Sequence, residues 1–175
     1  MHTAIHFTAE QCTVQQTLLA EHGQLRASLF CYPSGVCALR LDNALGHLIL
    51  LPYQGQQIWD AHLRGRRLTM KSMFDAPVPT RDFLSSYGGF LLHCGATCMG
   101  VPGPDDKHPL HGELHSAPYQ NASVLIGADA RGSYIGLTGS YRHTQAFQCN
   151  YVATPVVKLY ADSSVFTVAM EIHNQ

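Results

Sequence analysis

Short β-like segments separated by turn residues set the tightest limit on how this chain can fold. Apolar residues recur in runs or in alternation with polar ones, and Gly, Pro, Asn or Asp residues interrupt them at intervals typical of strands. Most connections are too short for crossover helices, so neighbouring strands should run antiparallel. The pattern predicts an all-β fold, an antiparallel β-sandwich with two packed sheets. The expected strands cover residues 24–32, 36–41, 47–52, 58–63, 68–70, 122–128, 133–141, 147–153, 156–161 and 165–172.

The chain is expected to form a single domain over residues 1–175. Its length and a hydrophobic fraction of 46% are enough to bury one substantial core. No internal repeat, low-complexity tract or linker divides the sequence. Residues 14–20 fit either a short helix or a strand. Trp59, the single tryptophan, lies in an alternating segment and is predicted to belong to the core.

Composition argues against several classes of function. The formal net charge is −1, without the basic excess that a nucleic-acid partner would require. The longest strongly apolar runs, such as residues 47–52, are far too short to span a membrane. The N-terminus has neither a basic region nor an apolar region of the kind found in signal peptides. We therefore expect a cytoplasmic protein that binds neither nucleic acid nor membrane.

The cysteine content is also consistent with a cytoplasmic protein. The six cysteines are Cys12, Cys31, Cys37, Cys94, Cys98 and Cys149. In a chain of this size without a signal peptide, reduced thiols are expected rather than a disulfide framework. Cys94 and Cys98 lie in an apolar segment, and we expect both to be small buried side chains.

A long connection precedes the most unusual part of the sequence. Residues 71–86 are polar, and Pro77 and Pro79 exclude a central strand there. A connection of this length in a compact domain is often functional. It leads into residues 87–119, which contain an apolar run, a Gly/Cys-rich segment and a Pro/Gly turn. We expect this stretch to be a loop that a rigid scaffold presents to a ligand.

The loop ends in HPLHGELH at residues 108–115, and this motif supports two kinds of site. The first is a metal centre in a cupin-like protein, with His108, His111 and His115 as imidazole ligands and Glu113 as a fourth. Zn, Fe and Mn accept such ligands. The spacing has no helical regularity, because Pro109 interrupts the segment.

The second kind of site binds a polar small molecule. His111 and His93 could hydrogen-bond hydroxyl groups and transfer protons, and Arg81, Asp82 and Tyr87 are close to them in sequence. Convergent His, Asp, Glu and Tyr groups suit a polyol, whereas a phosphate would call for Arg, Lys or a glycine cradle. For most of the histidines individually, capping of backbone groups in a loop is the simpler alternative.

These residues carry a family resemblance. LPYQGQQIWD at residues 51–60 and RGRRL at 64–68 resemble an early strand pair of galactose mutarotase-like proteins. YGG at 87–89, CG at 94–95 and HPLHGE at 108–113 occur in an order similar to the DUF4432 branch of the aldose 1-epimerase superfamily. The similarity extends over about residues 45–175 and has a moderately specific two-part central motif.

The resemblance implies a β-supersandwich with a sugar-binding cleft and no cofactor. In such enzymes a glutamate removes the proton of the anomeric hydroxyl, a histidine protonates the ring oxygen, and the opened ring closes on its other face. His111 matches the histidine of the Leu-His-Gly motif and is the expected catalytic residue. With this resemblance, the candidate substrate-binding residues are His93, His111, Glu113 and Arg81. A non-catalytic module that binds a sugar without changing its rate of anomerisation is a further alternative.

The sequence also departs from the family pattern. Many mutarotases carry an Asn-Arg pair ahead of the motif, and here that region reads LHCGATCMG, which leaves His93 and Arg81 as the candidates to replace it. The family's second histidine and its glutamate base come from later strands, so neither His173 nor Glu113 is assigned to those roles. We expect residues 1–175 to form the N-terminal part of a longer domain. Alone they should be inactive, and either unstable or self-associated through an exposed sheet edge.

Overall fold

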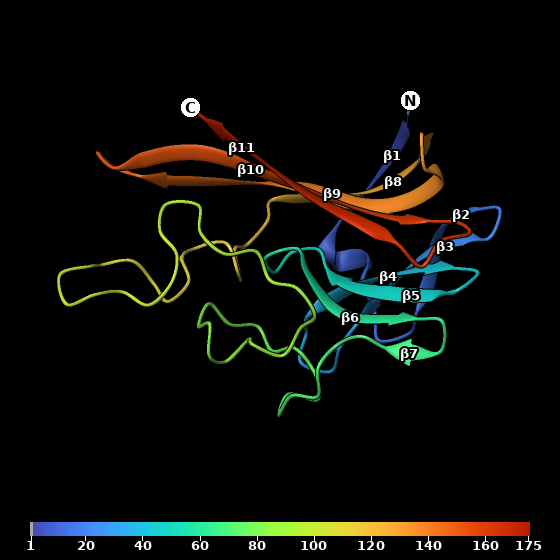
Figure 1. The fold of residues 1–175 in the computed structure, drawn as a ribbon, viewed down its shortest axis with the longest axis horizontal. Helices are drawn as coiled ribbons and strands as arrows, with labels where there is room; N and C mark the ends of the chain where they lie inside the picture. The colour runs from blue at the N-terminus through green and yellow to red at the C-terminus, as the bar shows by residue number, and fades with distance from the viewer. Residues whose placement is uncertain (1) are drawn as a thin grey trace.

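The structure, a computed structural model, describes residues 2–175 and is built almost entirely of strands (Figure 1). Its single helical element within that range is η1, a 3-10 turn at Ala9–Gln11. No helix in residues 2–175 has the length and apolar character needed to cross a membrane. The strands are β1 (His2–Phe7), β2 (Thr17–His22), β3 (Leu25–Cys31), β4 (Cys37–Asn43), β5 (Gly46–Leu51), β6 (Gln57–Leu63), β7 (Arg66–Arg67), β8 (Asn121–Asp129), β9 (Gly132–Gln145), β10 (Cys149–Tyr160) and β11 (Phe166–Asn174).

The strands form two sheets that lie one above the other in Figure 1. One sheet has five strands in the order β1-β8-β9-β10-β11, and the other has six in the order β2-β3-β4-β5-β6-β7. Every pair of neighbours is antiparallel. The predicted all-β fold, an antiparallel sandwich, is confirmed.

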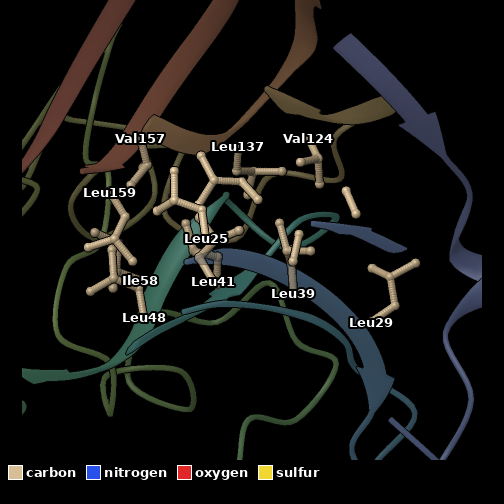
Figure 2. Close-up of a cluster of buried hydrophobic side chains, with 14 of the residues drawn as sticks. Leu25, Leu29, Leu39, Leu41, Leu48, Ile58, Val124, Leu137, Val157 and Leu159 are labelled. Carbon is tan, nitrogen blue, oxygen red and sulfur yellow. The ribbon is translucent and has the colours of Figure 1, made fainter. Parts of the chain in front are cut away.

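The main core lies between the two sheets (Figure 2). Alternate residues of a strand point to the same face, so each strand delivers every second side chain to this layer. The six-stranded sheet contributes Leu25, Leu29, Leu39, Leu41, Leu48 and Ile58, and the five-stranded sheet contributes Val124, Leu137, Val157 and Leu159. Burial of each such side chain is worth roughly 1.5–3 kcal/mol, which makes this layer the main source of stability.

The opposite face of the six-stranded sheet carries a second apolar cluster. Ala38 adjoins Leu39 in β4 and therefore points away from the main core. Ala38 packs with Trp59, and Phe74 from the long connection covers them. Trp59 is 5% exposed, so its predicted place in a core is confirmed. Part of the long connection therefore serves as a cover for this sheet.

Two predicted strands are one in the structure, because β10 runs without interruption through Pro155. The residue pairs formed with β9 stop at Ala153–Tyr141 and resume in the same register at Val156–Thr138. Pro155 has no N–H to donate, but its carbonyl accepts a hydrogen bond of 2.8 Å from the Thr138 hydroxyl. The side-chain bond replaces part of the missing ladder, so the proline does not end the strand.

The N-terminal part of the chain and the end of the second sheet also differ from the sequence prediction. The pattern missed β1, and the ambiguous segment at 14–20 becomes a strand from Thr17 onward. The predicted strand at 68–70 is wrong, because β7 consists of Arg66–Arg67. Arg64 and Gly65 have φ values of 53° and 71°, a two-residue hairpin turn that lets pairing resume at once.

Cysteine chemistry differs from the prediction as well. Cys12 and Cys37 form a disulfide with a Cα–Cα distance of 5.5 Å, so the expectation of six reduced thiols is wrong. The chain that follows η1 brings Cys12 to the start of β4, where the Cys31 N–H donates to the Thr13 carbonyl at 2.7 Å. Cys98 is exposed and Cys94 is half-buried, which corrects the prediction that both are buried.

Residues 68–120 form the long connection between the two sheets. In Figure 1 it runs, in green to yellow, beside β4–β6 and below the far end of the β9–β10 hairpin. Backbone hydrogen bonds tie it to β6, since the Phe90 N–H donates to Ile58 and the Ile58 N–H donates to Leu91. The Gln57 amide also donates to the His115 carbonyl at 2.7 Å. The connection is thus an irregular but anchored layer.

The first prediction concerns the main core. Leu39→Ala, at a position that is 0% exposed, should lower the free energy of unfolding by about 2–5 kcal/mol because it leaves a cavity. Leu18→Ala removes the same atoms at a strand position that is 59% exposed, and it should change the free energy of unfolding by less than about 1 kcal/mol. Urea denaturation of both variants measures the difference. Equal losses would contradict the placement of the core.

Candidate functional site

A cavity lined mostly by residues with polar or charged side chains lies under the end of the β9–β10 hairpin. Its volume is about 560 Å³. The long connection supplies one side, and β9, β10 and the turn between them supply the other. The lining residues are Arg81, Thr97, Cys98, Asp106, Lys107, His108, Pro109, Glu113, His143, Gln145, Gln148 and Cys149. We call this space the hairpin cavity. Of the predicted site residues, Arg81 and Glu113 border it.

Glu113 fixes the geometry of the hairpin cavity. Its Oε1 accepts hydrogen bonds from the Ala96 N–H at 2.9 Å and the Thr97 N–H at 3.1 Å, and from the Tyr151 hydroxyl. Its Oε2 accepts one from the Thr97 hydroxyl at 2.8 Å. The side chain is 7% exposed. One carboxylate thus ties two parts of the long connection to β10, and only Oε2 keeps acceptor capacity for a ligand.

The hydrogen bonds also set the charge of this group. Burial by itself would raise the pKa of Glu113, but the bonds from Tyr151, Thr97 and the Ala96 N–H outweigh it and hold that pKa below its ordinary value. Burial and the bond to Glu113 raise the pKa of Tyr151. Glu113 is therefore an anion at neutral pH, and Tyr151 is a neutral donor.

Gly112 allows the HPLHGELH segment to pack against the loop around Cys98. Its φ is +85°, and a Cβ at this position would lie 2.3 Å from the Cys98 carbonyl oxygen and 2.7 Å from the Gly95 Cα. The Cβ of any other residue would therefore push the HPLHGELH segment away from the loop around Cys98. His111, just before it, has a φ of 59°, also in the left-handed region. The Leu-His-Gly motif thus supplies a histidine and also allows two loop segments to cross in close contact.

His111 lies beside the hairpin cavity rather than in its lining. Its ring is half-buried and packs on Phe83, with ring centroids 4.3 Å apart. His115, which is 2% exposed, contacts the same phenylalanine at 5.2 Å. Burial lowers the pKa of His115, and the nearby Arg81 and His111 lower it further. Phe83 therefore packs against two of the three histidines of the HPLHGELH segment, His111 and His115.

His93 is an interior residue and does not border the hairpin cavity. It is 9% exposed, and its Nε2 has no hydrogen-bond partner within residues 2–175. Burial lowers the pKa of His93 to about 4. The ring is thus neutral at physiological pH, and its substrate-binding role stays a prediction that this position does not favour.

Sequence analysis missed the contribution of β9. His143 pairs directly with Tyr151 across the β9–β10 ladder, and its Nδ1 lies 3.1 Å from the Tyr141 hydroxyl. The three rings form a polar aromatic cluster near the turn of the hairpin, with His143 in the cavity lining. The available signal was the alternation of Tyr141, His143 and Gln145, which places polar groups where the strand would otherwise present apolar ones.

The metal alternative finds no support in the geometry. Within residues 2–175, no group of three or more His, Cys, Asp or Glu side chains is arranged to hold a metal ion. The Nδ1 of His108 bonds to the Pro109 carbonyl, that of His115 bonds to the Gly112 carbonyl, and His111 packs on Phe83. The three imidazoles predicted as ligands are therefore committed to separate contacts.

A larger space, of about 940 Å³, lies over β2, β3 and β4. The charged groups along it are already paired with each other: Arg40 binds Asp42 at 2.7 Å and Arg26 faces Glu21 at 3.5 Å. It contains no histidine or cysteine. The hairpin cavity is the better candidate for chemistry.

Comparison with known proteins identifies the family. The sequence profile of a family described as a domain of unknown function, DUF4432, matches residues 33–175. The chain belongs to the DUF4432 family. The resemblance inferred from the YGG, CG and HPLHGE motifs is thereby confirmed.

A solved structure shows which fold this DUF4432 chain shares. It is that of a proposed aldose 1-epimerase from Klebsiella pneumoniae subsp. pneumoniae MGH 78578, with a TM-score of 0.75 and 15% sequence identity. The match covers 99% of this chain and 51% of that chain. The fold is therefore galactose mutarotase-like, as predicted.

A curated relative carries a different name. It is the S-adenosylmethionine:tRNA ribosyltransferase-isomerase of Sorangium cellulosum (strain So ce56), which is 32% identical over 138 residues. The match covers 69% of this chain and 36% of the relative. The DUF4432 chain thus spans only a part of the proteins that it matches.

A pH-dependent stability should follow from the burial of His93. Because burial lowers its pKa to about 4 from the ordinary value of 6.5, the unfolded chain takes up a proton first as the pH falls. Stability should therefore be lost between about pH 6.5 and pH 4, by roughly 2–3 kcal/mol, and His93→Gln should remove this part of the loss. Urea denaturation at several pH values measures it, with His22→Gln at an exposed strand position as the control.

Removal of one donor to Glu113 tests the anchoring of the long connection. Tyr151→Phe should lower the free energy of unfolding by about 1.5–3 kcal/mol, the range for a hydrogen bond to a charged group. Tyr134→Phe changes another buried tyrosine, whose hydroxyl has no hydrogen-bond partner within residues 2–175, and should have a smaller effect. In a double-mutant cycle, Tyr151→Phe and Glu113→Gln should be coupled. Strict additivity would show that the two groups do not interact.

Proposed function

We propose that this DUF4432 protein is a carbohydrate-binding isomerase of the aldose 1-epimerase type, which interconverts the α and β anomers of an aldose by acid/base ring opening. One observation supports the proposal above all: a polar cavity with imidazole, carboxylate, guanidinium and amide groups lies in a fold of the mutarotase type. Such a set can bind several hydroxyl groups and transfer protons near neutral pH. We also propose a role in carbohydrate metabolism in the cytoplasm.

The groups around the cavity suggest a division of roles. Gln145 and Gln148 offer amide donors and acceptors for sugar hydroxyls, and Glu113 Oε2 offers one more acceptor. His111 remains the proposed acid toward the ring oxygen because it matches the family motif. His143 borders the cavity, as His108 does, and its free Nε2 makes it the alternative for this role.

The chain spans 51% of the structural neighbour, so the activity of the whole protein is part of the proposal as well. We propose that these residues form the N-terminal part of a mutarotase-like domain. The tRNA reaction in the name of the Sorangium relative is not proposed here. Lys and Arg number 11 against 12 Asp and Glu, so the charge balance offers no electrostatic support for a tRNA substrate.

Anomer interconversion provides the test. The full-length protein should accelerate the approach of a freshly dissolved aldose to its anomeric equilibrium, followed by polarimetry or NMR exchange. His111→Asn, which tolerates the left-handed backbone, should lower kcat/KM by about two to four orders of magnitude. His22→Asn, at an exposed position of β2, should leave it unchanged.

The outcome separates the two histidines. An intact rate in His111→Asn together with a large loss in His143→Asn would transfer the acid role to His143. No acceleration over a panel of hexoses, pentoses, deoxysugars and acidic sugars would reject the epimerase proposal.

A further inference from the structure

The hairpin cavity has an uneven supply of hydrogen-bonding groups. Its two carboxylates differ: Glu113 is buried and accepts four hydrogen bonds, whereas Asp106 is more exposed and accepts the Gly103 N–H at 2.8 Å through Oδ2. The cation closest to Asp106 is the His108 ring, whose Nε2 lies 3.9 Å away. The buried negative charge of the cavity, that of Glu113, is thus committed to holding the loop.

The arginine and lysine side chains of the cavity, in contrast, have no partner of opposite charge in the described part of the chain. Arg81 and Lys107 both border the cavity, and neither belongs to any of the ion pairs formed within residues 2–175. His143 uses Nδ1 toward the Tyr141 hydroxyl, which leaves Nε2 available. The cavity therefore presents two cations without an ion pair and a free imidazole nitrogen, while its buried carboxylate, Glu113, is largely occupied.

A neutral sugar does not use this arrangement well. Its hydroxyl groups need acceptors as well as donors, and the buried carboxylate of the cavity, Glu113, keeps acceptor capacity only on Oε2. An arginine and a lysine are the side chains that bind anionic oxygens, the arginine as a planar fork and the lysine as a point charge. From the sequence, a phosphate would call for Arg, Lys or a glycine cradle, and the fold brings an arginine and a lysine to one cavity.

We propose that the substrate of this site is an acidic sugar, whose carboxylate or phosphate lies between Arg81 and Lys107. The sugar ring then extends toward Gln145, His143 and Glu113 Oε2, where its hydroxyl groups find partners. This inference rests on the proposed function for the sugar, and adds the charge that the sugar carries. Arg81 and Lys107 become the specificity-determining residues.

Binding measured apart from catalysis tests the inference. Isothermal titration calorimetry would compare galacturonate with galactose, and glucose 6-phosphate with glucose. The acidic member of a pair should bind at least about tenfold more tightly, and this advantage should shrink at high salt because both cations are exposed. The preferred pair shows whether the anion is a carboxylate or a phosphate. Equal affinity of acidic and neutral sugars in both pairs would overturn the inference.

Substitutions assign the preference to the two cations. Arg81→Gln and Lys107→Gln should each remove most of the advantage of the acidic sugar over its neutral partner. Arg66→Gln alters an exposed arginine of β7, away from the cavity, and should have no effect on either. A preference for acidic sugars that survives the double variant Arg81→Gln/Lys107→Gln would also overturn the inference.

Two cysteines report where the ligand binds. Cys98 and Cys149 border the hairpin cavity, whereas Cys31 and Cys94 do not. A bound acidic sugar should slow alkylation of Cys98 and Cys149 by iodoacetamide, read for each peptide by mass spectrometry, and leave Cys31 and Cys94 as internal controls. Tight binding without this protection would place the anion elsewhere and reject the site.

The binding results stay separate from the anomerisation results. Preferred binding of an acidic sugar without accelerated anomerisation would reject the epimerase proposal and keep the inference. Accelerated anomerisation of neutral sugars with no preference for acidic ones would keep the epimerase proposal and reject the inference.

Discussion

The carboxylate of Glu113 is the interaction on which the candidate site depends. A buried carboxylate is costly unless hydrogen bonds replace its water, and this one has four protein donors. The donors come from the loop at Ala96 and Thr97 and from Tyr151 in β10, so the charge joins an irregular segment to a rigid strand. The tight crossing at Gly112 brings the segments close enough for these bonds. The shape of the hairpin cavity follows from this connection, because its two sides are the parts that Glu113 holds together.

Much of the sandwich could be predicted because strand periodicity and turn residues are local signals. The exceptions have identifiable causes. Pro155 suggested a break in β10, but the Thr138 hydroxyl compensates for part of the lost backbone bond. The pattern missed β1, whose residues are mostly exposed and whose partner, β8, is far away in sequence. The Cys12–Cys37 disulfide was also beyond prediction, since it depends on how η1 lies against β4 rather than on cysteine spacing.

The site was predicted only in part. The loop at residues 87–119 was recognised, and Arg81 and Glu113 do border the cavity. The contributions of His143 and Tyr151 depend on the register of two strands that follow the loop, and a register of this kind is not visible in a motif. The emphasis on clustered histidines was misleading because proximity in sequence does not make side chains converge. Phe83 holds His111 and His115, while His93 is in the interior.

The chemistry of the site has to be argued from its side chains, since a match at 15% identity establishes the fold alone. Glu113 illustrates the point. A carboxylate whose pKa is held below its ordinary value is a weak base, and three of its four hydrogen bonds converge on one oxygen. The features that make Glu113 a good anchor therefore make it a poor acceptor for the proton of an anomeric hydroxyl. Loop anchoring and proton abstraction belong to different groups in any epimerase mechanism for this protein, and Glu113 contributes by fixing the cavity that Arg81, Lys107 and His143 border.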